Sequence, residues 1–466
     1  MLPAKTVGVM DNTLTSTPLT PKVSSIAKTS VQSGLDFSTA TRVEDLLPNV
    51  SPAYSTLFGA AYRSQREPFR GSHRLTSPLL LHEKTHVMTV SGSSNARAHR
   101  GSGMAAMLLA LFFCLIVARA QGQTALGRYR IESNKITVSG ISSGGYMAVQ
   151  LGVAYSSVFS GVGVFAAGPY GCADTGGSVN LNIRRAVGPC MAGRYEFMQR
   201  SWCNLGWATC PGIDAPDAHA SIQLAREKEA RHYIDPLSNL ARQRVFLLSG
   251  NKDKTVESKV VDALARFYEA LVPLPQIERV RRDGLAHTFP TAAFSHGNKC
   301  AVSEPPFVSD CNYDGAKQVL WHLYGPLDAL RSDAPAAAVI EFDQRPFFPA
   351  GTSPGMGDSG YLYVPASCTG SASAGCRLHV ALHGCGQTIA DIGMTFVTGA
   401  GYNRWADANR VIVLYPQVRK TNGLFSDNPK GCWDWWGYTG AGWDDKRGIQ
   451  LRAIVAMVNR LSSPSP

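Results

Sequence analysis

A short run of glycines and serines carries the first sign of chemistry, Gly140-Ile141-Ser142-Ser143-Gly144. It follows a predicted strand at 135–139 and precedes a predicted helix at 145–157. A serine between glycines in such a strand-to-helix turn is held exposed for nucleophilic attack, and glycines are needed where the tight turn packs against its neighbours. We therefore predict that Ser142 is a catalytic nucleophile. Ser143 is out of register, and the alternative interpretation is a glycine-rich turn without a catalytic role.

A serine hydroxyl needs a base, and the base needs a carboxylate that holds it in the correct tautomer. Asp253 lies in the loop after a predicted strand at 245–249, where such a carboxylate is expected. His287 lies in the loop after the next predicted strand, 276–281, and is the candidate base; His296 is the alternative. At each position the non-catalytic interpretation is an ordinary polar loop residue.

Two backbone N–H groups must bind the negative oxygen that forms during acyl transfer. One is expected directly after the nucleophile, at Ser143. The predicted strand 378–383 leads into His383-Gly-Cys385-Gly, which is similar to the loop that supplies the second donor in esterases. We therefore predict an oxyanion hole made by the N–H groups of Ser143 and Cys385. This loop follows the candidate triad in the chain, whereas it usually precedes the nucleophile.

Two further patterns are weaker. Gly357-Asp358-Ser359-Gly360 is similar to a protease motif but lacks its sequence context. His379 and His383 alternate on a strand without the cysteine or carboxylate spacing that a metal site requires. The sequence therefore predicts neither a metal ion nor a cofactor.

The elements that would position these residues alternate between strands and helices. Further predicted strands lie at 162–166, 361–364 and 411–415, and further predicted helices at 256–271, 316–324, 389–409 and 448–461. This alternation predicts an α/β fold with a mostly parallel sheet covered by helices on both faces. Residues 326–360 are expected to form a long connection, and residues 172–242 an inserted lid or loop region.

Joining the two ends of this region explains the unusual order of the motifs. If the C-terminus is joined to the N-terminus, the strand at 378–383, which leads into the Cys385 loop, comes before the strand that leads to Ser142. This is the ordinary order of an α/β-hydrolase. We therefore expect residues 121–466 to form a single, circularly permuted α/β-hydrolase domain, which is possible because domain termini often lie close together.

The N-terminal part of the chain does not resemble a folded domain. Residues 104–120 combine an apolar run with Ala118-Arg119-Ala120, which is typical of a secretory signal peptide cleaved after Ala120. We interpret residues 1–103 as a disordered leader that arises from a start codon placed too far upstream, with Met88 as the alternative start.

The remaining cysteines agree with export to the medium or the periplasm. Ten follow the signal peptide, an even number without a C-x-x-C pair, which favours up to five disulfides. Three pairs could close short loops, and the other four cysteines could pair as well, although the sequence does not determine the connectivity. The three short-loop pairs are Cys203/Cys210, Cys300/Cys311 and Cys368/Cys376; the others are Cys172/Cys190 and Cys385/Cys432.

Composition excludes several classes of protein. With 44% hydrophobic and 17% charged residues, the chain is neither disordered throughout nor a polytopic membrane protein. The net charge of +11 is concentrated at the N-terminus, where residues 1–103 hold 11 Lys or Arg against 6 Asp or Glu. The remaining charge is too dilute for a nucleic-acid site, and no apolar run reaches the ~20 residues that stable membrane insertion needs. We expect a monomer.

Four motifs together resemble the secreted, circularly permuted polyhydroxybutyrate depolymerases. They are Gly140–Gly145, Cys311-Asn-Tyr-Asp-Gly315, His383-Gly-Cys-Gly-Gln387 and Gly431-Cys-Trp-Asp-Trp-Trp-Gly-Tyr438, and the resemblance covers about residues 130–461. It implies a cofactor-independent esterase that cuts poly(3-hydroxybutyrate), with Ser142, Asp253 and His287 as the triad. In that family an aromatic residue of the last motif lines the crevice.

An aromatic cluster at 433–443 fits an apolar polyester, since flat rings give a large contact area at small entropic cost. We expect Trp435 and Trp436 to bind substrate, with core packing as the alternative role. Another secreted esterase on the same scaffold, of the feruloyl or acetylxylan type, is the alternative function, because aromatic residues also bind phenolics and sugars.

Overall fold

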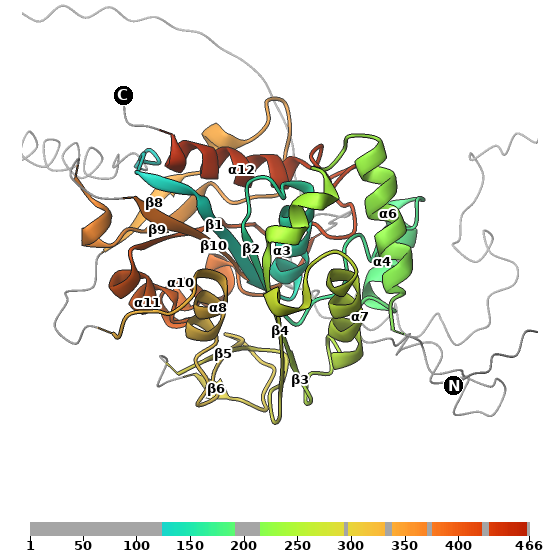
Figure 1. Ribbon diagram of the computed structural model, residues 1–466, viewed down its shortest axis with the longest axis horizontal. Coiled ribbons are helices and arrows are strands. Elements are labelled where there is room, and N and C mark those ends of the chain that lie inside the picture. The colour runs from blue at the N-terminus through green and yellow to red at the C-terminus, as the bar shows by residue number, and fades with distance from the viewer. Residues whose placement is uncertain are drawn as a thin grey trace, which may run out of the picture. The chain divides into compact units, whose positions relative to one another are not determined.

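A computed structural model describes residues 124–191, 215–292, 297–330, 338–370, 375–421 and 428–463. An eight-stranded sheet runs through them in the order β4-β3-β2-β1-β10-β11-β9-β8 (Figure 1). The six strands from β4 to β11 pair in parallel, and β9 pairs antiparallel with β11 and β8, so the predicted mostly parallel sheet is confirmed. The strands are β1 (Ile131–Ile141), β2 (Gly161–Phe165), β3 (Arg244–Gly250), β4 (Ile277–Arg282), β8 (Val339–Asp343), β9 (Ser359–Tyr363), β10 (Cys376–Leu382) and β11 (Val411–Tyr415).

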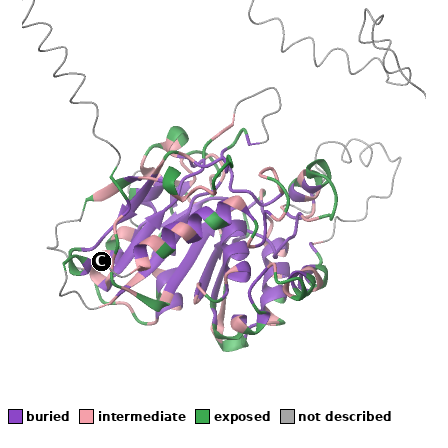
Figure 2. Cartoon of the chain, turned by 90° about the horizontal axis from the view of Figure 1, so that it is seen from above, coloured by how far each residue is buried: buried purple, intermediate pink, exposed green. Residues whose placement is uncertain are grey.

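Helices cover both faces of the sheet, as the sequence predicts. On β3, Val245 and Leu247 belong to one core cluster, with α3, α7 and α12, while Phe246 and Leu248 belong to the other, with α8, α10 and α11. Figure 2 shows the strands as a buried interior and the exposed residues mainly on the outer surfaces of helices and loops. The helices are α3 (Ser143–Ala154), α4 (Val179–Val187), α6 (Ala218–Ala230), α7 (Ser258–Glu269), α8 (Gly315–Tyr324), α9 (Ile389–Ile392), α10 (Thr395–Gly399), α11 (Tyr402–Asn409) and α12 (Ile449–Ser462).

The position of β1 in the sheet decides where the site forms. Although β1 is the first strand of the described chain, it lies in the middle of the sheet, between β2 and β10. Val138 is paired with Val162 on one side and with Val380 on the other. The turn after β1 therefore lies beside the loop after β10. This order agrees with a circular permutation, which itself stays a prediction.

Several local predictions were wrong in detail. The helix predicted at 389–409 consists of three short helices, because Gly393 and Gly401 adopt the left-handed backbone (φ 56° and 97°) that interrupts a helix. The predicted connection at 326–360 contains the edge strand β8. In the described part of the predicted lid or loop region, 172–242, α4 and α6 are helical and Leu237–Arg242 forms a 3₁₀ helix. A second, three-stranded sheet was not predicted; it consists of β5 (Phe289–Thr291), β6 (Asn298–Lys299) and β7 (Val308–Asp310).

Disulfides link the loops around this sheet. Within the described residues, four of the expected pairs are present: Cys172–Cys190, Cys300–Cys311, Cys368–Cys376 and Cys385–Cys432. The predictions for the leader at 1–103, the signal peptide at 104–120, Cys203/Cys210 and His296 lie outside the described residues. None of the helices in the described part of the chain is long and apolar enough to cross a membrane.

Candidate active site

Ser142 lies in the sharp turn between β1 and α3. Its backbone has φ 55° and ψ −123°, a strained conformation that non-glycine residues seldom adopt. A Cβ on Gly140 would lie 2.3 Å from Gly144, and one on Gly144 would lie 2.4 Å from the carbonyl oxygens of Leu382 and His383. The two glycines of the motif are therefore required for the turn to pack against itself and against β10.

Asp253 and His287 meet after β3 and β4, as the sequence predicts. His287 Nδ1 lies 2.8 Å from Asp253 Oδ2, so Nδ1 carries a proton and donates it in a hydrogen bond to the carboxylate. The other oxygen, Oδ1, accepts the N–H groups of Thr255 and Val256, each at 2.8 Å. Asp253 is 3% exposed and His287 8% exposed. The carboxylate is thus fixed from behind, and its second oxygen is left to orient the imidazole.

A cavity of about 940 Å³ brings the predicted residues together. Ser142, His287 and Cys385 line it, while Asp253 stands behind His287. Much of the remaining wall is apolar. Asp391, Lys420 and Lys430 are the charged residues of the wall, and Lys420 is paired with Asp391. A substrate in this cavity could therefore contact the serine, the histidine and the loop that carries Cys385 at once.

The loop after β10 passes close to Ser142. A Cβ on Gly384 would lie 3.3 Å from the Ser142 Cβ. The Gly384 N–H donates to Gln387 Oε1 at 2.7 Å, and Gln387 Nε2 donates to the carbonyls of Pro306 and Phe307. Among the described residues, the N–H groups of Ser143 and Cys385 have no acceptor within the chain. Both donors predicted for the oxyanion hole are therefore available to a ligand.

His383, which the sequence left without a role, also holds this loop. Burial lowers its pKa to about 4, so the ring is neutral at physiological pH. His383 Nε2 accepts the Val418 N–H at 3.4 Å, and Nδ1 therefore donates to the Gly384 carbonyl at 2.8 Å. No local pattern reveals this role or that of Gln387, because both depend on where the loop turns.

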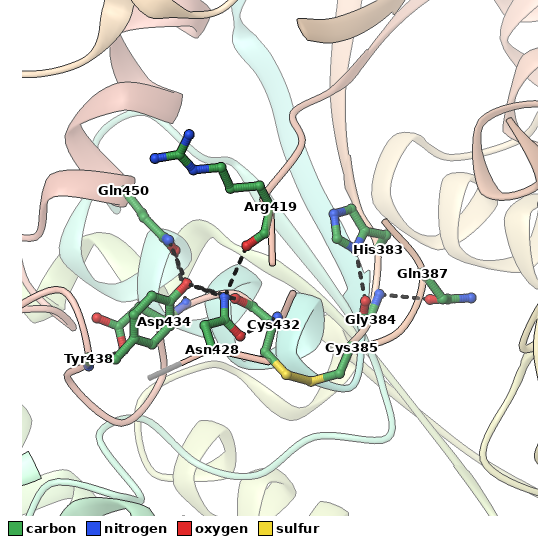
Figure 3. Close-up of a disulfide and its surroundings, with 10 residues drawn as sticks. All are labelled: His383, Gly384, Cys385, Gln387, Arg419, Asn428, Cys432, Asp434, Tyr438 and Gln450. Carbon is green, nitrogen blue, oxygen red and sulfur yellow. Dashed lines mark hydrogen bonds between the residues drawn. A yellow bond between two sulfur atoms is a disulfide. The ribbon is translucent and has the colours of Figure 1, made fainter. Parts of the chain in front are cut away.

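Figure 3 shows how the Cys385–Cys432 disulfide joins the oxyanion loop to the segment that carries the aromatic cluster. Asn428 holds the far side of this link, since its Oδ1 accepts the Cys432 N–H at 2.8 Å and its Nδ2 donates to the Cys432 carbonyl at 2.9 Å. The oxyanion loop and the aromatic segment therefore form one cross-linked wall of the cavity.

The aromatic cluster divides between core and cavity. Trp433 is fully buried, as the alternative interpretation expects. Trp435 and Trp436 are also largely buried, but both line the cavity. Trp435 stacks on Tyr146, with ring centroids 4.0 Å apart and planes inclined by 8°. Trp435 is therefore held in a fixed orientation in the wall of the cavity that holds Ser142, and the role of both tryptophans in substrate binding stays a prediction.

Asp434 organises the turn that follows these tryptophans. Its carboxylate accepts the N–H groups of Trp436, Gly437, Tyr438 and Thr439, together with the Thr439 hydroxyl. Burial raises the pKa of Asp434, and these hydrogen bonds oppose that effect.

Within the described ranges, no group of His, Cys, Asp or Glu could hold a metal ion.

Several known proteins are similar to this chain over most of its length. No protein-family model matches it. The chain is 38% identical over 349 residues to a polyhydroxybutyrate depolymerase of Talaromyces funiculosus, covering 73% of this chain and 93% of that protein. It is 40% identical over 337 residues to a poly(3-hydroxybutyrate) depolymerase of Delftia acidovorans, covering 72% of this chain and only 61% of that longer protein.

Solved structures agree with the sequence relatives. The crystal structure of PHB depolymerase from Penicillium funiculosum matches with a TM-score of 0.62 and 36% identity, over 73% of this chain and 99% of that one. A serine-to-alanine variant of PHB depolymerase in complex with an R3HB trimer matches equally well. On these similarities, the chain belongs to the polyhydroxybutyrate depolymerase family.

Proposed function

We propose that this protein is a serine esterase that hydrolyses poly(3-hydroxybutyrate) or its oligomers. The observation that carries the proposal is a cavity lined by a serine in a strained turn, by a histidine paired with a buried carboxylate, and by Cys385. Among the described residues, the N–H groups of Cys385 and of Ser143, which follows the serine, have no acceptor. Family membership supports the substrate class, as does the R3HB trimer bound by a structural relative.

In the first half of the reaction, Ser142 Oγ attacks the carbonyl carbon of the ester and His287 Nε2 takes the serine proton. The negative charge moves to the carbonyl oxygen, where the N–H groups of Ser143 and Cys385 stabilise it. When the C–O bond breaks, the leaving alkoxide takes the proton from His287. The products are a free alcohol and an acyl group on Ser142.

In the second half, water replaces the alcohol. His287 removes a proton from the water as it attacks the acyl carbon, and the same two N–H groups bind the second oxyanion. Collapse releases a carboxylic acid and returns the proton to Ser142 Oγ. One ester and one water thus give one acid and one alcohol, without a cofactor.

Asp253 acts through His287 rather than on the substrate. By accepting the Nδ1 proton at 2.8 Å, it keeps Nε2 free to receive the serine proton and stabilises the imidazolium that forms. Its buried position makes this interaction stronger than it would be in water.

The cavity wall suits a neutral polyester. Trp435 and Trp436 offer flat apolar surface in the cavity that holds Ser142, and we propose that they contact the hydrocarbon part of the polyester. The disulfides support action in an oxidising compartment, outside the cell or in the periplasm. We propose that the enzyme works there as a monomer.

The test is clearing of an amorphous poly(3-hydroxybutyrate) suspension by the wild-type protein, by Ser142→Ala and by a buffer blank, with methyl ferulate as a control ester. We expect clearing by the wild type alone and little cleavage of the ferulate. Ser142-dependent cleavage of ferulate without clearing would contradict the substrate and favour the feruloyl-esterase alternative.

A further inference from the structure

The loop that carries Cys385 is fastened at two successive residues to the segment 428–432. Cys385 forms the disulfide with Cys432, and the Gly386 N–H donates to the Lys430 carbonyl at 2.7 Å. The position of the Cys385 N–H therefore depends on where the segment 428–432 is held.

The hydroxyl of Tyr438 joins this segment to a core helix. It donates to the Cys432 carbonyl at 2.7 Å, and it accepts the side-chain N–H groups of Asn428 at 3.0 Å and of Gln450 at 2.8 Å (Figure 3). Asn428 and Cys432 belong to the segment, whereas Gln450 lies in α12, which packs in the core on one face of the sheet. One hydroxyl thus links the far side of the disulfide to a rigid part of the molecule.

This hydroxyl is itself held firmly. Gln450 Nε2 also donates to the Pro354 carbonyl at 2.6 Å, and Gln450 Oε1 accepts the Asp434 N–H at 2.8 Å. Burial raises the pKa of Tyr438 well above its ordinary value, so the hydroxyl stays protonated and keeps donating. Hydrogen bonds in such buried surroundings are stronger than in water, which favours a single arrangement of the segment.

Tyr438 stands outside the cavity that holds Ser142. Among the described residues, Cys385 and Cys432 line this cavity, but Tyr438 and Gln450 do not. A substrate bound there would not touch the Tyr438 hydroxyl. Any effect of this hydroxyl on the reaction must therefore pass through the segment that it holds.

We propose that the Tyr438 hydroxyl is a positioning group for the reaction. It holds Cys432, and through the disulfide it keeps the Cys385 N–H at the place where the oxyanion forms. The inference rests on the proposed function, which assigns that N–H to the oxyanion hole. Such a donor accelerates the reaction only if it is in place before the charge develops, and a small displacement costs rate. Because the donor acts mainly in the transition state, its displacement lowers kcat more than it changes KM.

Tyr438→Phe tests this role, because it removes only the hydroxyl and keeps the ring beside Trp436, with centroids 4.9 Å apart in the wild type. We expect kcat for p-nitrophenyl butyrate to fall about fivefold, with KM within about twofold of wild type. Thermal denaturation gives the Tm of each protein, and the kinetics are measured well below the lower Tm.

An alkyl trifluoromethyl ketone gives a second measurement, which a merely structural role would not change. Ser142 Oγ adds to the ketone carbon and passes its proton to His287, so the adduct carries a negative oxygen like that of the reaction. The inhibition constant of the ketone should rise in Tyr438→Phe by about the same factor by which kcat falls.

Tyr363→Phe is the matched control. Tyr363 is 2% exposed, and its hydroxyl donates to Asp407 at 2.9 Å. Removing this buried hydroxyl should lower Tm, but kcat and the inhibition constant of the ketone should stay at their wild-type values.

Three results would overturn the inference: a lower Tm in Tyr438→Phe with unchanged kcat and inhibition constant, a raised KM with unchanged kcat, or the same loss of kcat in Tyr363→Phe. Failure of the proposed function would look different. The wild type itself would then neither cleave p-nitrophenyl butyrate nor bind the ketone, and the inference would fall with it.

Discussion

Two serines lie three residues apart, Ser139 within β1 and Ser142 just after it, and the histidines that accompany them have very different surroundings. Ser139 Oγ lies 2.8 Å from His379 Nε2, and Ser142 shares a cavity with His287. Ser139 and His379 are both fully buried, and neither lines the cavity that holds Ser142. A serine near a histidine is therefore not sufficient for catalysis, and the surroundings of each pair show what else is needed.

The buried pair is part of a hydroxyl network. Thr137 donates to Tyr324 and therefore accepts from His379 Nδ1 at 2.7 Å, which leaves Nε2 to accept from Ser139. Tyr402 completes the network at 2.6 Å from Ser139. No carboxylate touches His379 in these contacts, and burial lowers its pKa to about 3. This ring cannot readily take a serine proton, whereas His287 has Asp253 to stabilise its charged form.

The largest expected effect compares the two serines. Ser142→Ala should lower esterase activity at least about 10³-fold, because the nucleophile is lost and only binding and the oxyanion hole remain. Ser139→Ala should keep activity within about threefold and lower the free energy of unfolding by about 1–3 kcal/mol, through lost buried hydrogen bonds. Steady-state kinetics and urea unfolding measure both. Loss of activity in Ser139→Ala with intact Ser142→Ala activity would reverse the assignment.

Asp253→Asn tests what distinguishes His287 from His379. The Thr255 and Val256 N–H groups require an oxygen at the Oδ1 position, so the new amide NH₂ would face His287. His287 Nδ1 would then have to accept, which places the ring proton on Nε2 and blocks proton transfer from Ser142. We expect kcat to fall about 10³- to 10⁴-fold with little change in Tm. A fall below 10-fold would show that the carboxylate does not set the tautomer.

The pH dependence of stability reports on the buried histidine. The pKa of His379 is lowered from 6.5 to about 3, so between these values the unfolded chain binds a proton that the folded protein does not. The contribution of neutral His379 to the free energy of unfolding is therefore complete above pH 6.5. It is lost as the pH falls toward 3, by about 3 kcal/mol at pH 4.

Urea unfolding at pH 7 and pH 4 measures this loss. Between pH 7 and pH 4, the free energy of unfolding of His379→Gln should fall by about 3 kcal/mol less than that of wild type. The His219→Gln variant, changed at an exposed histidine, should behave as wild type. An unchanged loss in His379→Gln would contradict the assignment of His379 as a neutral structural group.

The smallest expected effect concerns the oxyanion loop, which the buried pair lacks altogether. Gln387→Met removes the acceptor of the Gly384 N–H, and we expect kcat to fall about 10-fold with KM nearly unchanged, because the Cys385 N–H is no longer held in position. Gln243→Met is the control, since Gln243 is a buried glutamine whose side chain donates, among the described residues, to the backbone carbonyls of Gly152 and Phe159. It should lower Tm without changing kcat. Equal effects on kcat would mean that Gln387 is merely structural.

The same contrast explains what the sequence could predict. The turn at Ser142 is encoded locally, because Gly140 and Gly144 are needed within five residues of chain, and the pairing of Asp253 with His287 follows from their places after neighbouring strands. The Ser139–His379 pair joins residues 240 positions apart, and the contacts of Gln387 with Pro306 and Phe307 join residues about 80 positions apart. Such features depend on tertiary packing and leave no local pattern.

Covalent labelling tests the central claim most directly. After inactivation by diisopropyl fluorophosphate, peptide mapping by mass spectrometry should place a single phosphoryl adduct on Ser142, with Asp253→Asn reacting far more slowly. Ser142→Ala should remain unlabelled and serve as the control. An adduct on Ser139 or Ser143, or an active protein that resists labelling, would contradict the account.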